Sequence, residues 1–129
     1  MVTTAYLDTS AAMKLLIRER ESEALRDELV HNAHRLVASW LLHTELHCAA
    51  GRHPTLIAAT AVTAMLDAVV LVDVTRGDLL SAGTHAPLRS GDAIHLATAL
   101  RLGADTILTY DDELARAATN AGIAVLAPE

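Results

Sequence analysis

The stretch VTTAYLDTSAAM, residues 2–13, joins a short apolar segment to a polar turn and then to a helix-forming run. The β-branched and aromatic residues within 2–7 predict a strand, and this strand stops at the acid Asp8. Thr9 and Ser10 are both good N-cap residues, so we expect a helix to open at one of them. A strand that passes directly into a helix is a building unit of α/β proteins.

The same alternation of strand and helix continues to the end of the chain. Four further strands are predicted, at 36–38, within VVLVDV (69–74), at 106–109 and at 123–126. Helices are expected in the charged segment 18–35, from Ser39 to Gly51, from Thr55 (just after Pro54) to about Val69, from Thr75 onward, from Ser90 to Leu102 and over 112–120. Helices between strands, with no two-residue hairpin, predict a mostly parallel sheet covered on both faces. We therefore expect an α/β fold, a three-layer α/β/α sandwich, forming one domain over 1–129.

Composition excludes several classes of protein. Hydrophobic residues make up 52% of the chain, but no apolar run reaches the roughly 18 residues of a membrane span and no signal-peptide pattern opens it. We expect a soluble, cytoplasmic protein without a membrane partner. A net charge of −6 opposes broad, charge-driven adhesion to nucleic acid. The lone Cys48 supports neither a disulfide scaffold nor a zinc finger and is interpreted as a small apolar helix residue.

Acids follow two of the predicted strands. Asp8 and Asp111 each come just after a strand, and parallel strands deliver their following loops to one edge of the sheet. This geometry predicts that the two carboxylates share a rim. An equally plain interpretation is that each acid caps a helix or sits in its first turn, where free N–H groups and the helix dipole favour negative charge.

Two more acids lie on predicted helices. Glu45 projects from an apolar stripe, where an unpaired charge costs several kcal/mol, so it requires a cation: an arginine such as Arg52, or a metal. Asp92 opens a polar strip that continues through His95, Thr98 and Arg101, which a solvated helix face would explain. Clustered carboxylates repel and either take up protons or recruit a cation. All-oxygen ligands favour Mg²⁺ or Mn²⁺ over zinc.

Four blocks of the sequence resemble the PIN-domain ribonucleases of the VapC toxin type, in the order found in that family. The blocks are YLDTSAAMKLL, SWLLHTELHCAAGR, SGDAIHLATALRLGAD and TILTYDDELARAATNAGI, and together they span nearly the whole chain. By this resemblance Asp8, Glu45, Asp92 and Asp111 match the metal-binding, catalytic acids. Ser10 and Thr109 match small hydroxyl residues beside the site. Asp112, next to Asp111, is a possible substitute for the fourth acid.

The resemblance implies a function for this acid cluster. It implies a Mg²⁺-dependent endoribonuclease toxin, with Mn²⁺ as a substitute ion, that hydrolyses RNA to 5′-phosphate and 3′-hydroxyl ends. It also implies a homodimer and a small antitoxin that blocks the site. His43 and His47 flank Glu45 and could attract a softer metal, but we interpret them as partly exposed helix residues.

Three other functions are compatible with parts of the sequence. A PIN fold with a silent site would serve as an RNA-binding or scaffold module, although all four acids are present. A phospho-acceptor signalling domain also carries acids at strand ends, but it needs a lysine at a late strand, and the only lysine here is Lys14. A zinc deaminase shares the H-x-E order of His43 and Glu45, but one cysteine cannot supply its P-C-x-x-C half.

Overall fold

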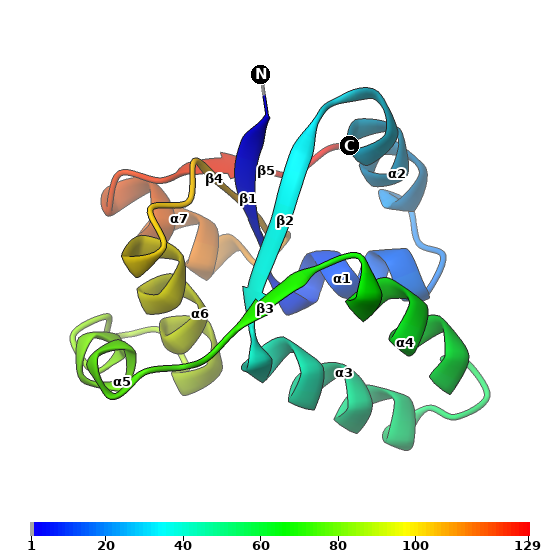
Figure 1. Cartoon of the computed structure of the whole chain (residues 1–129), viewed down its shortest axis with the longest axis horizontal. Coiled ribbons are helices and arrows are strands. Elements are labelled where there is room, and N and C mark those ends of the chain that lie inside the picture. The colour runs from blue at the N-terminus through cyan, green and yellow to red at the C-terminus, as the bar shows by residue number, and fades with distance from the viewer. Residues whose placement is uncertain (1) are drawn as a thin grey trace.

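The computed structural model describes residues 2–129, and its centre is a five-stranded sheet in which every strand runs parallel to its neighbours (Figure 1). The spatial order is β3-β2-β1-β4-β5, so the first strand of the chain lies in the middle. The strands are β1 (Thr3–Leu7), β2 (His34–Ser39), β3 (Val70–Val72), β4 (Thr106–Leu108) and β5 (Ala124–Leu126). The predicted parallel α/β fold is confirmed.

Seven helices, formed by the described residues, cover the two faces of the sheet in separate groups. Packing contacts join α1 (Thr9–Leu16), α2 (Ser22–His31), α3 (Trp40–Arg52) and α4 (Ala59–Asp67) on one side. The other side carries α5 (Arg76–Ala82), α6 (Ser90–Arg101) and α7 (Asp112–Asn120). Figure 1 shows the two groups on opposite sides of the strands, which is the three-layer arrangement expected from the sequence. None of these helices is both long and apolar enough to cross a membrane.

The sheet topology creates a natural crevice between β1 and β4. The chain leaves β1 toward β2 and β3, and then returns across the other face to place β4 on the opposite side of β1. Strand order therefore reverses at this pair, and in open α/β sheets ligands bind beyond the carboxyl ends at such a point. The Asp8 N–H donates to the Leu108 carbonyl at 3.0 Å, which holds the two strand ends together.

Several predicted boundaries are wrong, each for a local reason. The first helix opens at Thr9 as expected, but its cap is Asp8 and not Thr9 or Ser10, because the Asp8 carboxylate accepts the Ser10 N–H at 3.3 Å. The charged helix of 18–35 shortens to Ser22–His31, since the chain from His34 enters β2.

Two later helices also open at unexpected residues. The helix expected from Thr55 starts only at Ala59. It follows a turn in which the Leu56 and Ile57 N–H groups donate to the His53 carbonyl and Ile57 becomes buried. Ser90 does not cap α6: Arg89 occupies that position and its side chain makes no capping hydrogen bond. The strands and the remaining helices were predicted in the right order, with ends shifted by a few residues.

Candidate active site

Asp8 lies at the crevice, and one of its two carboxylate oxygens accepts three hydrogen bonds. Its Oδ2 accepts the Ser10 hydroxyl at 2.6 Å, the Thr109 hydroxyl at 2.9 Å and the Ser10 N–H at 3.3 Å. The residue is only 2% exposed, so these donors hold a buried charge in place. Within residues 2–129 no donor reaches Oδ1. Asp8 is therefore both a helix cap and a fixed carboxylate with one oxygen left over.

The two small hydroxyl residues also fix the loop that carries Asp111. The Tyr110 N–H donates to the Ser10 hydroxyl at 2.9 Å, and the Asp111 N–H donates to the Thr109 hydroxyl at 3.1 Å. Asp111 caps α7 through Oδ1, which accepts the Leu114 N–H at 2.9 Å, and its Oδ2 receives no hydrogen bond from the described residues. The capping interpretation and the shared rim are thus both correct for Asp8 and Asp111.

Asp112 is placed differently from Asp111. It is exposed, it is the first residue of α7, and its side chain makes no hydrogen bond within residues 2–129. Asp111, by contrast, is near enough to Asp92 to influence its ionisation. The geometry brings Asp111 and not Asp112 toward the other acids.

Glu45 is a half-buried acid that takes a histidine as its partner. Its Oε1 accepts the Thr9 hydroxyl at 2.7 Å and lies 2.6 Å from His95 Nε2. Burial by itself raises the pKa of Glu45, but the hydrogen bonds from His95 and Thr9 outweigh it and hold that pKa below its ordinary value. The ion pair with Arg52 considered from the sequence does not form. The other oxygen, Oε2, faces Gly91, where an added Cβ would lie 3.2 Å away.

Asp92 has no hydrogen-bonding partner for its carboxylate within residues 2–129, and its ionisation is strongly perturbed. Burial, reinforced by the carboxylates of Asp111 and Asp8, raises its pKa to about 6. Glu45 contributes in the same direction, and His95 opposes it. All four predicted acids are therefore brought together electrostatically at one end of the sheet, with Asp92 carrying the cost of their repulsion.

The polar strip on α6 is not a solvated face, and this corrects the interpretation from the sequence. His95 is 1% exposed and Thr98 is fully buried. His95 contacts Glu45, while Thr98 donates to Asp78, which also pairs with Arg101. His95 is the site residue that the sequence analysis did not single out. Its spacing of three from Asp92 places both on one helix face, which was the only available signal.

The donor set fits a hard divalent cation. Counting donors among residues 2–129, Asp8, Glu45 and Asp111 each keep one free oxygen, and Asp92 keeps both. Among residues 2–129 no three acidic, histidine or cysteine groups are drawn together as a finished metal cage. Mg²⁺ does not require such a cage, because it keeps several waters and takes only one or two carboxylates. A cation would also relieve the repulsion that raises the pKa of Asp92.

Lys14 and His47, a cationic and a metal-binding side chain near the site, take partners other than the four acids. Lys14 lies 2.7 Å from Glu21 and 3.5 Å from Glu19, so it is engaged within its own helical layer. His47 is exposed and its Nδ1 lies 2.8 Å from the His43 carbonyl, while His43 is partly exposed, as expected. Cys48 lies on α3, as expected, and it is exposed.

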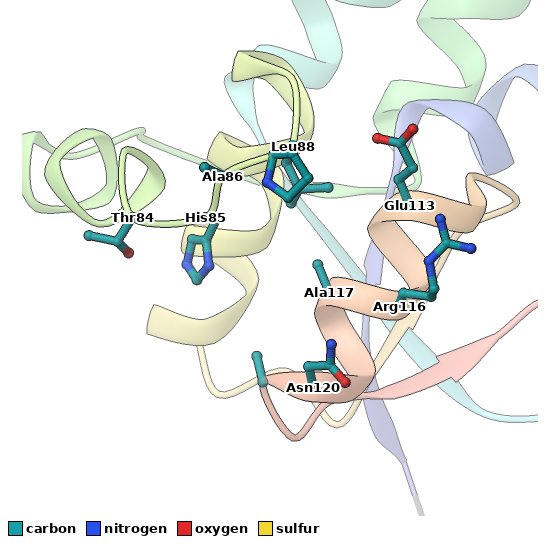
Figure 2. Close-up of a pocket in the computed structure, with 10 residues that line it drawn as sticks. Thr84, His85, Ala86, Leu88, Glu113, Arg116, Ala117 and Asn120 are labelled. Atoms are coloured by element: carbon teal, nitrogen blue, oxygen red, sulfur yellow. The ribbon is translucent and has the colours of Figure 1, made fainter.

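A groove of about 640 Å³ lies beside the acids without containing them (Figure 2). It separates the loop carrying His85 and Leu88 from α7, whose Glu113, Arg116 and Asn120 line the opposite wall. None of the four clustered acids lines this groove. Glu45 instead lines a smaller pocket of about 310 Å³, together with Thr9 and Arg52.

Comparison with known proteins identifies the family. The PIN domain family matches residues 5–120. Ribonuclease VapC46 of Mycobacterium tuberculosis is 42% identical over 127 residues, covering 95% of this chain and 96% of that protein. Ribonuclease VapC35 of the same species is 40% identical over 130 residues, with the same coverage. The chain belongs to the PIN-domain family, and its type within that family is VapC.

Solved structures share the fold at low sequence identity. The Mycobacterium tuberculosis toxin VapC20, described as cleaving the sarcin-ricin loop, superposes with a TM-score of 0.74 at 16% identity, covering 96% of this chain and 99% of that one. VapBC2 of Rickettsia felis, solved with a DNA fragment from its promoter, gives 0.74 at 12% identity, covering 98% and 99%. These likenesses confirm the fold.

Proposed function

We propose that the chain is a divalent-metal-dependent endoribonuclease toxin that hydrolyses RNA phosphodiester bonds. The observation that carries the proposal is the acid cluster: carboxylates from both helical layers lie near enough at the β1–β4 end of the sheet for Asp111, Asp8 and Glu45 to raise the pKa of Asp92. Each of the four keeps an oxygen that accepts no hydrogen bond from residues 2–129. Relatives named as ribonucleases at 42% and 40% identity support RNA as the substrate.

Each of the four acids has a role that follows from its surroundings. Asp8 and Asp92 would be the principal ligands of Mg²⁺ or Mn²⁺, since Asp8 is rigidly held and Asp92 has no competing partner. Glu45 would complete the coordination or take a proton from the attacking water, and Asp111 would hold a second ion or an ordered water. A bound ion of this kind activates water and neutralises charge on the phosphate.

The proposed reaction is hydrolysis with inversion at phosphorus. The water oxygen attacks in line, its bond to phosphorus forms, and the bond from phosphorus to the 3′ oxygen breaks. Glu45, whose lowered pKa keeps it ionised, accepts a proton from the water. The departing 3′ oxygen is protonated by solvent, which leaves a 3′-hydroxyl on one fragment and a 5′-phosphate on the other.

The proposed partners are a small antitoxin and a second copy of the chain. Several structural neighbours were solved as toxin-antitoxin complexes, including one from Klebsiella pneumoniae with a TM-score of 0.72 and 19% identity, covering 97% of this chain and 98% of that one. An antitoxin that places a basic side chain among the four acids would satisfy their charge and block RNA. A homodimer and a cytoplasmic location are further predictions.

The test is RNA cleavage by the purified chain and by its Asp92→Asn variant. Wild-type protein with Mg²⁺ or Mn²⁺ should produce new 5′-phosphate ends, read by end sequencing, and EDTA should abolish them. The variant should fold, as judged by circular dichroism, and cleave at least about 100-fold more slowly. RNA binding by both forms with no cleavage by either would indicate a silent scaffold module instead.

A further inference from the structure

A chain of hydrogen bonds runs from the centre of the sheet to the outer acid of the site. The Ser39 N–H donates to the Tyr6 hydroxyl at 3.1 Å, and that hydroxyl lies 2.7 Å from His95 Nδ1. On the other side of the ring, His95 Nε2 lies 2.6 Å from Glu45 Oε1. Tyr6 is fully buried and His95 is 1% exposed, so water does not complete these bonds.

Only one neutral tautomer of His95 satisfies both of its neighbours. If Nδ1 carried the proton, the unprotonated Nε2 would face a carboxylate oxygen at 2.6 Å, lone pair against lone pair. With the proton on Nε2, the ring donates to Glu45 and Nδ1 accepts the Tyr6 hydroxyl proton. The Tyr6 oxygen remains free to accept the Ser39 N–H. The Ser39 N–H, the Tyr6 hydroxyl and both ring nitrogens of His95 are then each paired.

The two donors on Glu45 act on the same oxygen. Thr9 and His95 both occupy Oε1, which leaves Oε2 as the oxygen turned toward Gly91 at the start of α6. A glutamate has three rotatable side-chain bonds, and two donors that converge on Oε1 remove most of that freedom. A buried donor thereby selects which carboxylate oxygen is offered to a ligand, in the way that outer-shell partners orient metal ligands.

We propose that His95 is a positioning residue that holds Glu45 with Oε2 directed into the acid cluster, its own tautomer being set by the Glu45 carboxylate and matched by the Tyr6 hydroxyl. The role rests on the proposed ribonuclease function, because Glu45 acts there as ligand or proton acceptor. His95 itself touches neither RNA nor the reacting atoms. Because its effect passes entirely through Glu45, substitutions at His95 and Glu45 should not have additive effects on cleavage.

The first test compares His95→Leu, which removes the donor, with His95→Gln, which can place an N–H near the Nε2 position. His95→Leu should lower kcat about 10- to 100-fold with KM for RNA nearly unchanged, and His95→Gln should recover most of the loss. In a Glu45→Gln background, His95→Leu should cost less than about 2-fold more, because the residue through which it acts is already lost. Equal costs in both backgrounds would overturn the proposal.

A matched control separates positioning from general destabilisation. Thr98→Val disturbs a fully buried polar residue one turn further along α6, where the hydroxyl donates to Asp78 and not to Glu45. It should lower the unfolding midpoint without changing kcat. A loss of kcat in Thr98→Val equal to that in His95→Leu would assign both effects to folding.

The second test needs no activity. In metal-free protein labelled with ¹⁵N, the His95 ring should show a proton on Nε2 and none on Nδ1, and Glu45→Gln, whose amide can donate or accept, should mix the two tautomers. A proton on Nδ1 in the wild type would overturn the proposal. An inactive wild type with the expected tautomer would defeat the ribonuclease function and leave the hydrogen-bond chain standing. An active wild type with unimpaired His95→Leu would defeat only the role of His95.

Discussion

At the residue scale, the ionised Asp92 carboxylate lowers the free energy of unfolding of the protein. Its pKa is raised from 3.8 to about 6, so the folded protein binds more protons than the unfolded chain between these values. Stability contributed by this group is therefore greatest below about pH 4 and falls as pH rises through 6. Asp92→Asn should raise the free energy of unfolding by about 1–2 kcal/mol at pH 7.5 without metal, a figure reduced for solvent screening.

The measurement is urea unfolding in EDTA at pH 7.5 and at pH 4. The advantage of Asp92→Asn should shrink toward zero at the lower pH, where the wild-type carboxyl is mostly protonated. A variant less stable than wild type at pH 7.5 would show that the neighbouring carboxylates do not strain Asp92. Asp112→Asn is the matched control, because the Asp112 carboxylate is exposed and lies outside the acid cluster. The free energy of unfolding of this variant should differ from that of the wild type by less than about 0.5 kcal/mol.

Gly91 tests how closely the two helical layers approach at the site. An added Cβ would lie 3.2 Å from Glu45 Oε2, so the carboxylate must shift by a few tenths of an ångström. Gly91→Ala should leave the unfolding midpoint nearly unchanged, because the helix preference of alanine offsets the small shift of the Glu45 carboxylate. RNA cleavage should fall about 3- to 10-fold, since small displacements of catalytic groups are expensive.

Gly51 provides the control for this substitution. It lies near the end of α3, and a Cβ added there meets nothing within 4 Å. Gly51→Ala should stabilise the protein by about 0.5–1 kcal/mol and leave cleavage unchanged. If both alanine variants cleave at the wild-type rate, the close approach of Gly91 to Glu45 has no catalytic consequence.

At the element scale, a buried acid ties α5 to α6. Asp78 is 2% exposed and completes a capping box with Thr75, while Arg101 donates to both of its oxygens, at 2.7 and 3.0 Å. Arg101→Met keeps the aliphatic stem and leaves the carboxylate without its cation. We expect a loss of about 2–3 kcal/mol, less than for a fully buried pair because the Arg101 side chain is 40% exposed.

Hydrogen exchange locates this effect. Amides of α5 should lose protection first, since α5 is a helix of 7 residues whose anchor is this acid. RNA cleavage should persist, because Asp78 lies outside the acid cluster. Arg116→Met is the control: Arg116 is exposed and forms no ion pair within residues 2–129, so its variant should be close to wild type. Equal stability of the two variants would refute the anchoring role.

Local sequence signals predicted some elements well and others poorly. α7 was predicted with its observed bounds because both ends are marked, by the Asp111 cap and by Gly122, whose φ of 92° suits glycine. The start of α4 was missed because tertiary burial of Ile57 decides it. The partner of Glu45 was missed for the same reason: His95 is 50 residues away, and spacing along one helix cannot reveal which face another helix covers.

At the scale of the whole molecule, the acids join the two helical layers. Asp8 caps α1 and Glu45 lies on α3, both in one layer, whereas Asp92 and Asp111 open α6 and α7 in the other. Figure 1 shows α1 and α3 on one side of the strands and α6 and α7 on the other. Asp8 and Asp111 could be predicted from strand ends because a parallel sheet collects its following loops at one rim, whereas Glu45 and Asp92 were singled out from helix patterns and the family resemblance. The division of the acids between layers required the topology.

This division predicts that a divalent cation stabilises the entire fold. A ligand that binds only the folded state adds RT ln(1 + [L]/Kd), about 2.7 kcal/mol at 100 times Kd, and here it also relieves repulsion between layers. At pH 7.5, Mn²⁺ should raise the unfolding midpoint of the wild type by several degrees in differential scanning calorimetry. At pH 5 the rise should be much smaller, because a proton occupies Asp92, whose pKa is about 6.

Asp92→Asn should show little rise in the unfolding midpoint at either pH, and Asp112→Asn should respond like the wild type. An equal rise in Asp92→Asn and wild type would place the ion elsewhere on a chain of net charge −6 and would remove the acid cluster as its binding site.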